Sequence, residues 1–198
     1  MSAAGITRAN LPQRTLACLA RGGWNSPDVL LVESDRGRAV VKDFAPRPWW
    51  LRETFGRWLI RRQAEVHRVL EGHPAVPRLF GCLDRLALVV EHRPGTRFSC
   101  RRPWTFTPEF VEALRAAVNG LHARGVVHLD LSHRSNLLAS PDGRPVLIDF
   151  DSALHFEKGS LRERLLLPWL RRIDLRALDK WSAAVRCNSP SDGSGGDV

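Results

Sequence analysis

The chain has 198 residues, of which 43% are hydrophobic and 26% are charged, and its formal net charge at pH 7 is +9. These fractions are ordinary for a globular protein, and no apolar run approaches the ~20 residues of a membrane-spanning helix. The basic excess favours anionic partners in general without choosing among them.

We expect neither a secretory signal nor a cysteine framework. The N-terminal sequence MSAAGITRANLPQRT lacks the apolar core of a secretory signal, so we expect a cytoplasmic protein. The four cysteines are scattered and form no CxxC pair, which indicates reduced thiols rather than a zinc site or a disulfide framework.

Three strands are predicted after an N-terminal extension, residues 1–13. The segments 14–20, 28–34 and 38–44 are apolar and are separated by turn signals, which is typical of an antiparallel meander. Lys42 follows an apolar run on the third strand, where its ammonium group needs an anionic partner unless the side chain reaches water. This lysine is therefore either a site residue or an ordinary residue near a strand end.

Residues 49–71 predict a helix, because polar and apolar residues recur there at helical spacing. Glu65 on this helix is our candidate ion-pair partner for Lys42, with Glu53 and Glu71 as fallbacks. The alternative is that Glu65 belongs to a solvated helix face, where charged residues are the norm.

A strand at residues 86–91 and the EHRPG connector after it are predicted to join two lobes. Nucleotides often bind where two lobes meet, so backbone groups near Glu91 are candidates for reading an adenine. A further helix is predicted over residues 108–123, with Thr107 as its N-cap and Gly125 as its stop.

The segment HLDLSHRSNLLASPDGRPVLIDFD, residues 128–151, carries three polar groups beside apolar runs. Asp130 follows the first run, Asn136 lies six positions later, and Asp149 ends the second run. Phosphoryl transfer from ATP needs a metal clamp on the phosphates and a carboxylate oriented towards the attacking hydroxyl. Asp149 and Asn136 would hold Mg²⁺, and Asp130 would accept or orient the proton. The alternative is a polar hairpin with incidental acids.

The chain after Asp151 predicts helical pieces that are broken or kinked at Pro168. The tail, residues 188–198, is polar and rich in glycine and serine. We expect this tail to be disordered.

The strand lysine, the helix glutamate, the connector, the HxD loop and the IDF acid follow one another in an order that resembles the protein-kinase-like superfamily, over residues 14–181. Within it, the chain most resembles the small bacterial lipopolysaccharide kinases that phosphorylate Kdo or heptose, and the RIO-type kinases. The resemblance implies an α+β, two-lobed protein-kinase-like fold. The N-lobe, residues 14–91, would hold an antiparallel sheet and one helix, and the reduced C-lobe, residues 92–187, would be mainly helical.

The resemblance also implies roles for individual residues. Lys42 would contact the α and β phosphates of ATP, and Glu65 would pair with it. Asp130 would be the catalytic acid/base. Asn136 and Asp149 would hold Mg²⁺.

Several residues depart from the protein-kinase pattern. Leu129 stands where an arginine would receive an activation-loop phosphate, and Asp151 replaces a glycine, with no APE-like motif after it. The step from the loop aspartate to the asparagine is one residue longer than usual, which leaves Ser135 as a rival for the metal position. The phosphate loop is reduced to Gly22 and Gly23, and a bare turn explains it equally well. An activation segment and a peptide-docking subdomain are therefore expected to be absent.

These features predict an ATP- and Mg²⁺-dependent kinase that acts on a hydroxyl, with a lipopolysaccharide-core sugar favoured over a protein because peptide-docking elements are missing. The alternatives are a RIO-like serine/threonine protein kinase and a nucleotide-binding pseudokinase that acts as a scaffold. No nucleic-acid partner is expected. Trp49, Trp50, Trp58 and Trp169 lie near arginines and would hold the protein peripherally at an anionic inner-membrane face, unless these side chains fill the core.

Overall fold

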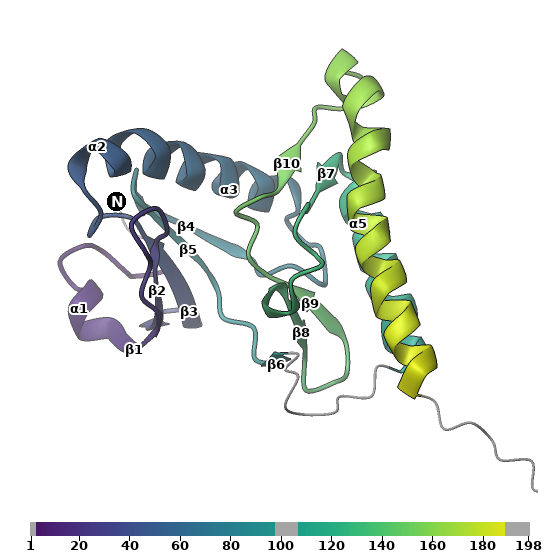
Figure 1. Cartoon of the computed structure of the whole chain (residues 1–198). Helices are drawn as coiled ribbons and strands as arrows, with labels where there is room; N and C mark the ends of the chain where they lie inside the picture. The colour runs from purple at the N-terminus through teal and green to yellow at the C-terminus, as the bar shows by residue number, and fades with distance from the viewer. Residues whose placement is uncertain (1–2, 98–106, 189–198) are drawn as a thin grey trace, which may run out of the picture.

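The computed structural model describes residues 3–97 and 107–188, with side chains described up to residue 183 of the last helix. These residues form a mixed α+β structure in which an antiparallel sheet with a helix across it is followed by a mainly helical part (Figure 1). This arrangement confirms the α+β class and is compatible with two small lobes. The tail that was predicted to be disordered lies, apart from residue 188, outside the described residues.

The N-terminal sheet has five strands, and every neighbouring pair in it is antiparallel. Its first three strands are the predicted meander, which is confirmed. Side chains alternate between the two faces of a strand, so Lys42 lies on the same face as Val40. Val40 packs against an apolar cluster that includes Leu59 and Ile60 of the helix across the sheet. In spatial order the strands are β1 Thr15–Ala20, β2 Asp28–Ser34, β3 Gly37–Asp43, β5 Ala87–Glu91 and β4 Leu79–Asp84.

The N-terminal segment, with the short helix α1 Leu11–Arg14, packs against the opposite face of the sheet. Ile6 is fully buried in that cluster. The guanidinium of Arg8 binds two carboxylates at strand ends, with Nη1 2.5 Å from Asp43 Oδ2 and Nε 2.6 Å from Asp84 Oδ2. The segment is therefore joined to the sheet by both apolar contacts and ion pairs.

The helix predicted over residues 49–71 is confirmed, although it is not a uniform α-helix. It consists of α2 Trp49–Leu51, a π-helical turn η1 Arg52–Gly56 and α3 Arg57–Val69. A Cβ atom at Gly56 would lie 3.0 Å from Cγ of Phe44, so the glycine allows the helix to approach the sheet closely.

The second part of the chain is built around two helices and short strands. The predicted helix at residues 108–123 is confirmed, and its N-cap is Thr107, whose Oγ1 accepts a hydrogen bond of 3.2 Å from the backbone N–H of Phe110. Gly125 follows the helix with φ of +75°, a conformation that glycine adopts without strain. The elements are β6 Thr96–Arg97, α4 Pro108–Ala123, β7 Val126–Val127, η2 Arg134–Asn136, β8 Leu137–Ala139, β9 Pro145–Leu147, β10 Leu154–His155 and α5 Leu161–Asn188.

The helix α5 runs through Pro168 without interruption, so the predicted break at this residue is wrong, whereas the kink that was its alternative stays a prediction. A proline removes one backbone hydrogen bond and favours a kink, but neighbouring packing can hold the two halves of the helix together. Leu167 lies buried just before the proline, and Leu178 and Trp181 are buried after it. Packing on both sides of Pro168 therefore outweighs its local preference.

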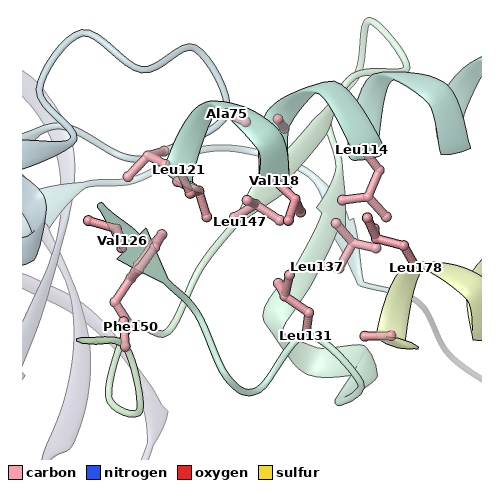
Figure 2. Packing of buried hydrophobic residues seen from close by; sticks show 14 of the residues in the cluster. Ala75, Leu114, Val118, Leu121, Val126, Leu131, Leu137, Leu147, Phe150 and Leu178 are labelled. Atoms are coloured by element: carbon pink, nitrogen blue, oxygen red, sulfur yellow. The ribbon is translucent and has the colours of Figure 1, made fainter. Parts of the chain in front are cut away.

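The largest apolar cluster lies between α4, α5 and the short strands of the second part (Figure 2). Val118, Leu121, Val126 and Leu147 are fully buried in it, and Trp181 is 2% exposed. The chain between β7 and β9 runs along this cluster, so the core fixes the segment in which the candidate site residues lie.

The four tryptophans singled out above are exposed at the surface. Trp49 is 72% exposed, Trp50 49%, Trp58 51% and Trp169 63%. The interpretation that these side chains fill the core is therefore wrong. Among the described residues, no helix combines the length and the apolar character needed to cross a membrane.

We expect the change Leu121→Ala to lower the free energy of unfolding by about 2 to 5 kcal/mol, because it opens a cavity in the largest core cluster. Urea denaturation followed by circular dichroism measures this. Leu161→Ala is the matched control, since Leu161 is 70% exposed and its truncation should cost less than about 0.5 kcal/mol. Equal losses in the two variants would contradict the placement of Leu121.

Candidate active site

A cavity of about 500 Å³ lies between the five-stranded sheet and the second part of the chain. One wall is apolar and comes from β1, β2, β3 and β5, while Leu138 and Ile148 lie on the opposite side. Lys42, Asn136 and Asp149, three residues predicted from the sequence, line this same cavity. A mostly apolar cavity with a few convergent polar groups is the usual form of a small-molecule site.

The polar part of the cavity centres on Lys42. Its Nζ lies 2.6 Å from Asp149 Oδ1 and 2.5 Å from Asp151 Oδ1, and its side chain is 13% exposed. Burial disfavours the charged ammonium, but the two carboxylates outweigh burial and raise the pKa of Lys42 above its usual value. This ion pair connects the sheet directly to the second part of the chain.

The two carboxylates beside Lys42 have different electrostatic environments. Burial opposes ionisation of Asp149, but the charge of Lys42 lowers its pKa to about 2. Burial and the neighbouring Asp149 raise the pKa of Asp151. The backbone of Asp149 also has a φ of +66°, and non-glycine residues held in this strained region cluster at functional sites.

The predicted ion pair between Lys42 and Glu65 is not formed, so this prediction is wrong. Glu65 is 56% exposed at its side chain, and its Oε1 lies 3.1 Å from Nδ1 of His155. Gln63 and His67 are the α3 residues that line the cavity, and both are buried. Their stripe of the helix points to the cavity, and Glu65 lies off that stripe.

Neither fallback glutamate, Glu53 or Glu71, forms an ion pair with Lys42, whose partners are Asp149 and Asp151. Glu53 forms ion pairs with Arg57 at 3.0 Å and with Arg52 at 3.8 Å. Asp151 takes the place that a helix glutamate was expected to take beside Lys42. It was visible in the sequence as an acid in place of a glycine, but nothing in the sequence indicated that it would contact a lysine 109 positions earlier.

The loop that carries Asp130 is held by hydrogen bonds to Asn136. Nδ2 of Asn136 donates to Oδ2 of Asp130 at 2.7 Å and to its backbone oxygen at 3.0 Å. Oδ1 of Asn136 accepts from Oγ of Ser135 at 3.0 Å. Ser135 and Asn136 both line the cavity, so the structure leaves both as donors for a cation near Asp149.

Asp174 is a residue that the sequence reasoning missed. Its fully buried carboxylate accepts hydrogen bonds from the backbone N–H groups of His128 at 2.9 Å and Leu129 at 2.8 Å. It also lies 2.9 Å from Nε2 of His122 on α4. The sequence signal that could have identified Asp174 is an acid on the apolar stripe of α5. Asp174 holds the loop in place where Leu129 adopts a strained φ of +68°.

His128 and His67 pack around Phe150 beneath the cavity. Nε2 of His128 hydrogen-bonds the backbone oxygen of Ile148 at 3.2 Å, and burial lowers the pKa of His128. Nδ1 of His67 hydrogen-bonds the backbone oxygen of Pro77 at 3.1 Å. Burial, with a smaller effect from the charge of Lys42, lowers the pKa of His67 to about 4.

The predicted phosphate loop is folded back on itself. The N–H of Gly22 donates to Oδ1 of Asp28 at 2.9 Å, and Arg47 ion-pairs with the same carboxylate. Arg47 also donates to the backbone oxygens of Gly22 and Gly23 at 2.8 and 2.9 Å. Neither glycine lines the cavity, so their contact with phosphate stays a prediction. Glu91 does line the cavity.

The oxygen donors near Lys42 fit a hard divalent cation. Mg²⁺ is usually bound by one or two carboxylates together with substrate phosphates and water. Asp149 and Asn136, with Asp151 beside them, offer donors of this kind. Among the described side chains, no three His, Cys, Asp or Glu residues form a ready cluster for a metal ion. The donors would therefore suit a cation that arrives with a phosphate ligand rather than a closed structural metal site.

Comparison with known proteins supports a kinase-like relationship. No family model matches the chain. An alignment over 156 residues shows 28% identity to the serine/threonine-protein kinase C of Synechocystis sp. (strain ATCC 27184 / PCC 6803 / Kazusa). The similarity covers 69% of this chain and 28% of that protein. The chain thus resembles a limited part of a much longer kinase.

We expect the change Asp174→Ala to lower the free energy of unfolding by at least about 3 kcal/mol, because it leaves two backbone donors and a histidine nitrogen buried without a partner. Chemical denaturation measures the loss. Asp179→Ala, on the exposed side of the same helix, is the control and should change stability by less than about 0.5 kcal/mol. One unsatisfied buried polar group costs about 1 to 3 kcal/mol, so a loss below about 1 kcal/mol for Asp174→Ala would contradict the proposed anchoring role.

The stability of the protein should depend on pH through His67. The pKa of this group is about 4 in the fold and about 6.5 when unfolded, so the unfolded state binds more protons between these values. Its contribution, about 3 kcal/mol in full, is present above pH 6.5 and declines as the pH falls towards 4. His67→Gln, which keeps a donor for Pro77, should flatten the decline in this window. The contribution of Asp149 to stability is lost at lower pH, below the pKa of about 3.9 that an aspartate has in the unfolded chain. An unchanged slope of stability against pH in the His67→Gln variant would refute the assignment.

Proposed function

We propose that the protein is an ATP- and Mg²⁺-dependent kinase that transfers the γ-phosphate of ATP to a hydroxyl group. The observation that carries the proposal is the contact of Lys42 with Asp149 at the polar end of an otherwise apolar cavity. The ammonium of Lys42 suits the phosphates of a nucleotide, and the neighbouring oxygen donors suit the metal ion that accompanies these phosphates. The apolar wall suits the base. The similarity to a kinase over 69% of the chain adds independent support.

The mechanism assigns roles to four residues, namely Lys42, Asp130, Asn136 and Asp149. Lys42 would bind the phosphate oxygens, and Asp149 with Asn136 would hold Mg²⁺, which neutralises phosphate charge when bound. The oxygen of the acceptor hydroxyl attacks the γ-phosphorus, the bond to the β–γ bridging oxygen breaks, and ADP leaves. The hydroxyl proton passes to Asp130, whose carboxylate is oriented by Asn136.

The acceptor class is the finer part of the proposal. Only residues 152–160 separate Asp151 from α5, and this short connection supports an acceptor other than a docked peptide, with a lipopolysaccharide-core sugar preferred. The name of the Synechocystis relative favours a protein serine or threonine instead. A RIO-like protein kinase is therefore the second candidate. A scaffold that binds nucleotide without transfer is the third.

We expect the purified protein to transfer label from γ-labelled ATP, and Asp130→Ala to reduce the transfer rate at least ~100-fold, because a general base contributes about 10²- to 10⁴-fold. The variant should still bind a fluorescent ATP analogue, since Asp130 does not line the cavity. Asp142→Ala, in an exposed turn, is the control and should transfer at the wild-type rate.

The same assay, run with core oligosaccharide and with cell protein as acceptors, separates the candidates. Label in the sugar supports the lipopolysaccharide assignment, whereas label confined to protein contradicts it in favour of the RIO-like one. Nucleotide binding without transfer to either acceptor would indicate the scaffold. An unchanged rate in Asp130→Ala would refute the catalytic assignment.

A further inference from the structure

A second cavity, also about 500 Å³, lies on another side of α3. It is bounded by α3, by β4 and by the turn after β4, and it shares only α3 with the cavity described above. Four arginines line it, namely Arg57, Arg61, Arg68 and Arg85. Arg57, Arg61 and Arg68 are spaced by whole turns of the helix, so their side chains share one stripe. We call this cavity the arginine pocket.

The positive charge of the arginine pocket is not balanced by the protein. Its one acid, Asp84, is already bound by Arg8 through two hydrogen bonds, at 2.6 and 3.0 Å. Arg57 has a partner in Glu53. Arg61, Arg68 and Arg85 form no ion pair within the described part of the chain. Three guanidinium groups therefore border one cavity without a counter-charge from this part of the protein.

Exposed aromatic rings border the arginine pocket on one side. Trp58 lines the pocket and is 51% exposed, and the guanidinium of Arg62 lies 4.2 Å from the centre of its ring. Phe55 lies 5.8 Å from Trp58, ring centre to ring centre, and is 38% exposed. Trp49 and Trp50 continue this exposed surface along α2. Large apolar side chains are rarely exposed in such a group without a partner.

We propose that the arginine pocket binds a phosphoryl anion through Arg61, Arg68 and Arg85. Guanidinium groups bind phosphate through paired N–H donors, and several of them around one cavity select a multiply charged or clustered phosphate over a single carboxylate. The phosphate of an anionic lipid headgroup and a free polyphosphate share this chemistry. The neighbouring Trp58, Phe55 and Trp49 favour the lipid, because aromatic side chains lie at the level of the headgroups in membrane interfaces.

The proposal does not depend on the kinase reaction, since the arginine pocket and the Lys42 cavity have no lining residue in common. It is tested by binding rather than by phosphate transfer, so its failure and the failure of the proposed function can be told apart.

The test compares two triple variants of the full chain that have the same net charge. One carries Arg61→Gln, Arg68→Gln and Arg85→Gln. The control carries three changes at exposed arginines of α5, which are Arg162→Gln, Arg164→Gln and Arg172→Gln. Calorimetric titration with tripolyphosphate measures binding of free phosphate, and co-sedimentation with vesicles of equal parts phosphatidylglycerol and phosphatidylcholine measures binding of headgroups. Thermal unfolding confirms that both variants are folded.

We expect the pocket variant to bind at least one of these probes at least about tenfold more weakly than the control, because a hydrogen bond to a charged group contributes about 1.5 to 3 kcal/mol. Loss confined to vesicles identifies a lipid headgroup, and loss confined to tripolyphosphate identifies a free phosphate. Equal binding of both probes by the two variants would overturn the proposal, because it would show that binding follows net charge and not the arginine pocket. Failure of the wild-type protein to bind either probe would also overturn it.

The aromatic surface gives a second measurement that does not alter charge. Trp58→Ala should weaken binding to the vesicles and leave tripolyphosphate binding unchanged if the headgroup is the source. Trp169→Ala is its control, because Trp169 on α5 is also exposed, at 63% against 51% for Trp58. A loss of vesicle binding that is the same in both tryptophan variants would contradict the placement of the lipid contact beside the arginine pocket.

Discussion

The buried contact of Lys42 with Asp149 and Asp151 is the interaction on which the rest of the site depends. An ammonium group at the inner face of a sheet is costly to bury, and its two carboxylate partners come from the other part of the chain. The sheet and the helical part must therefore keep their relative positions for the charge of Lys42 to be compensated. The apolar cavity is formed between them, so the electrostatic contact and the shape of the cavity are parts of one arrangement.

A second buried charge fixes the loop on the opposite side of the cavity. Asp174 reaches from α5 to the backbone of His128 and Leu129, and the apolar cluster between α4 and α5 fixes the position of α5. The core thereby holds the backbone just before Asp130, whose carboxylate is oriented by Asn136. This explains why a strained backbone conformation persists in the loop: packing and hydrogen bonds around it leave no relaxed alternative.

Local patterns in the sequence were sufficient to predict most elements and to single out several candidate site residues. The meander that carries Lys42 and the helix capped by Thr107 both follow from short-range signals. Asn136 and Asp149 were chosen as candidates from their place beside apolar runs, and they line the same cavity. Contacts across the fold were not accessible in this way. The partner of Lys42 was predicted to be Glu65, because helical spacing gives the face of a residue but not which face meets the sheet. Asp174 was missed since its role depends on backbone groups 45 and 46 positions away.

The ion pairs of Arg8 imply that a fragment of this chain needs the segment before the first strand. Arg8 precedes the first strand, yet it forms ion pairs with Asp43, the residue next to Lys42, and with Asp84 at the end of β4. A fragment that started at the meander would contain every candidate site residue but would lose the restraint on the strand that presents the lysine. The same fragment would leave Asp84 without Arg8, beside three guanidinium groups that have no ion-pair partner in the described part of the chain. Removing a segment that lines neither cavity would therefore alter the electrostatics of both.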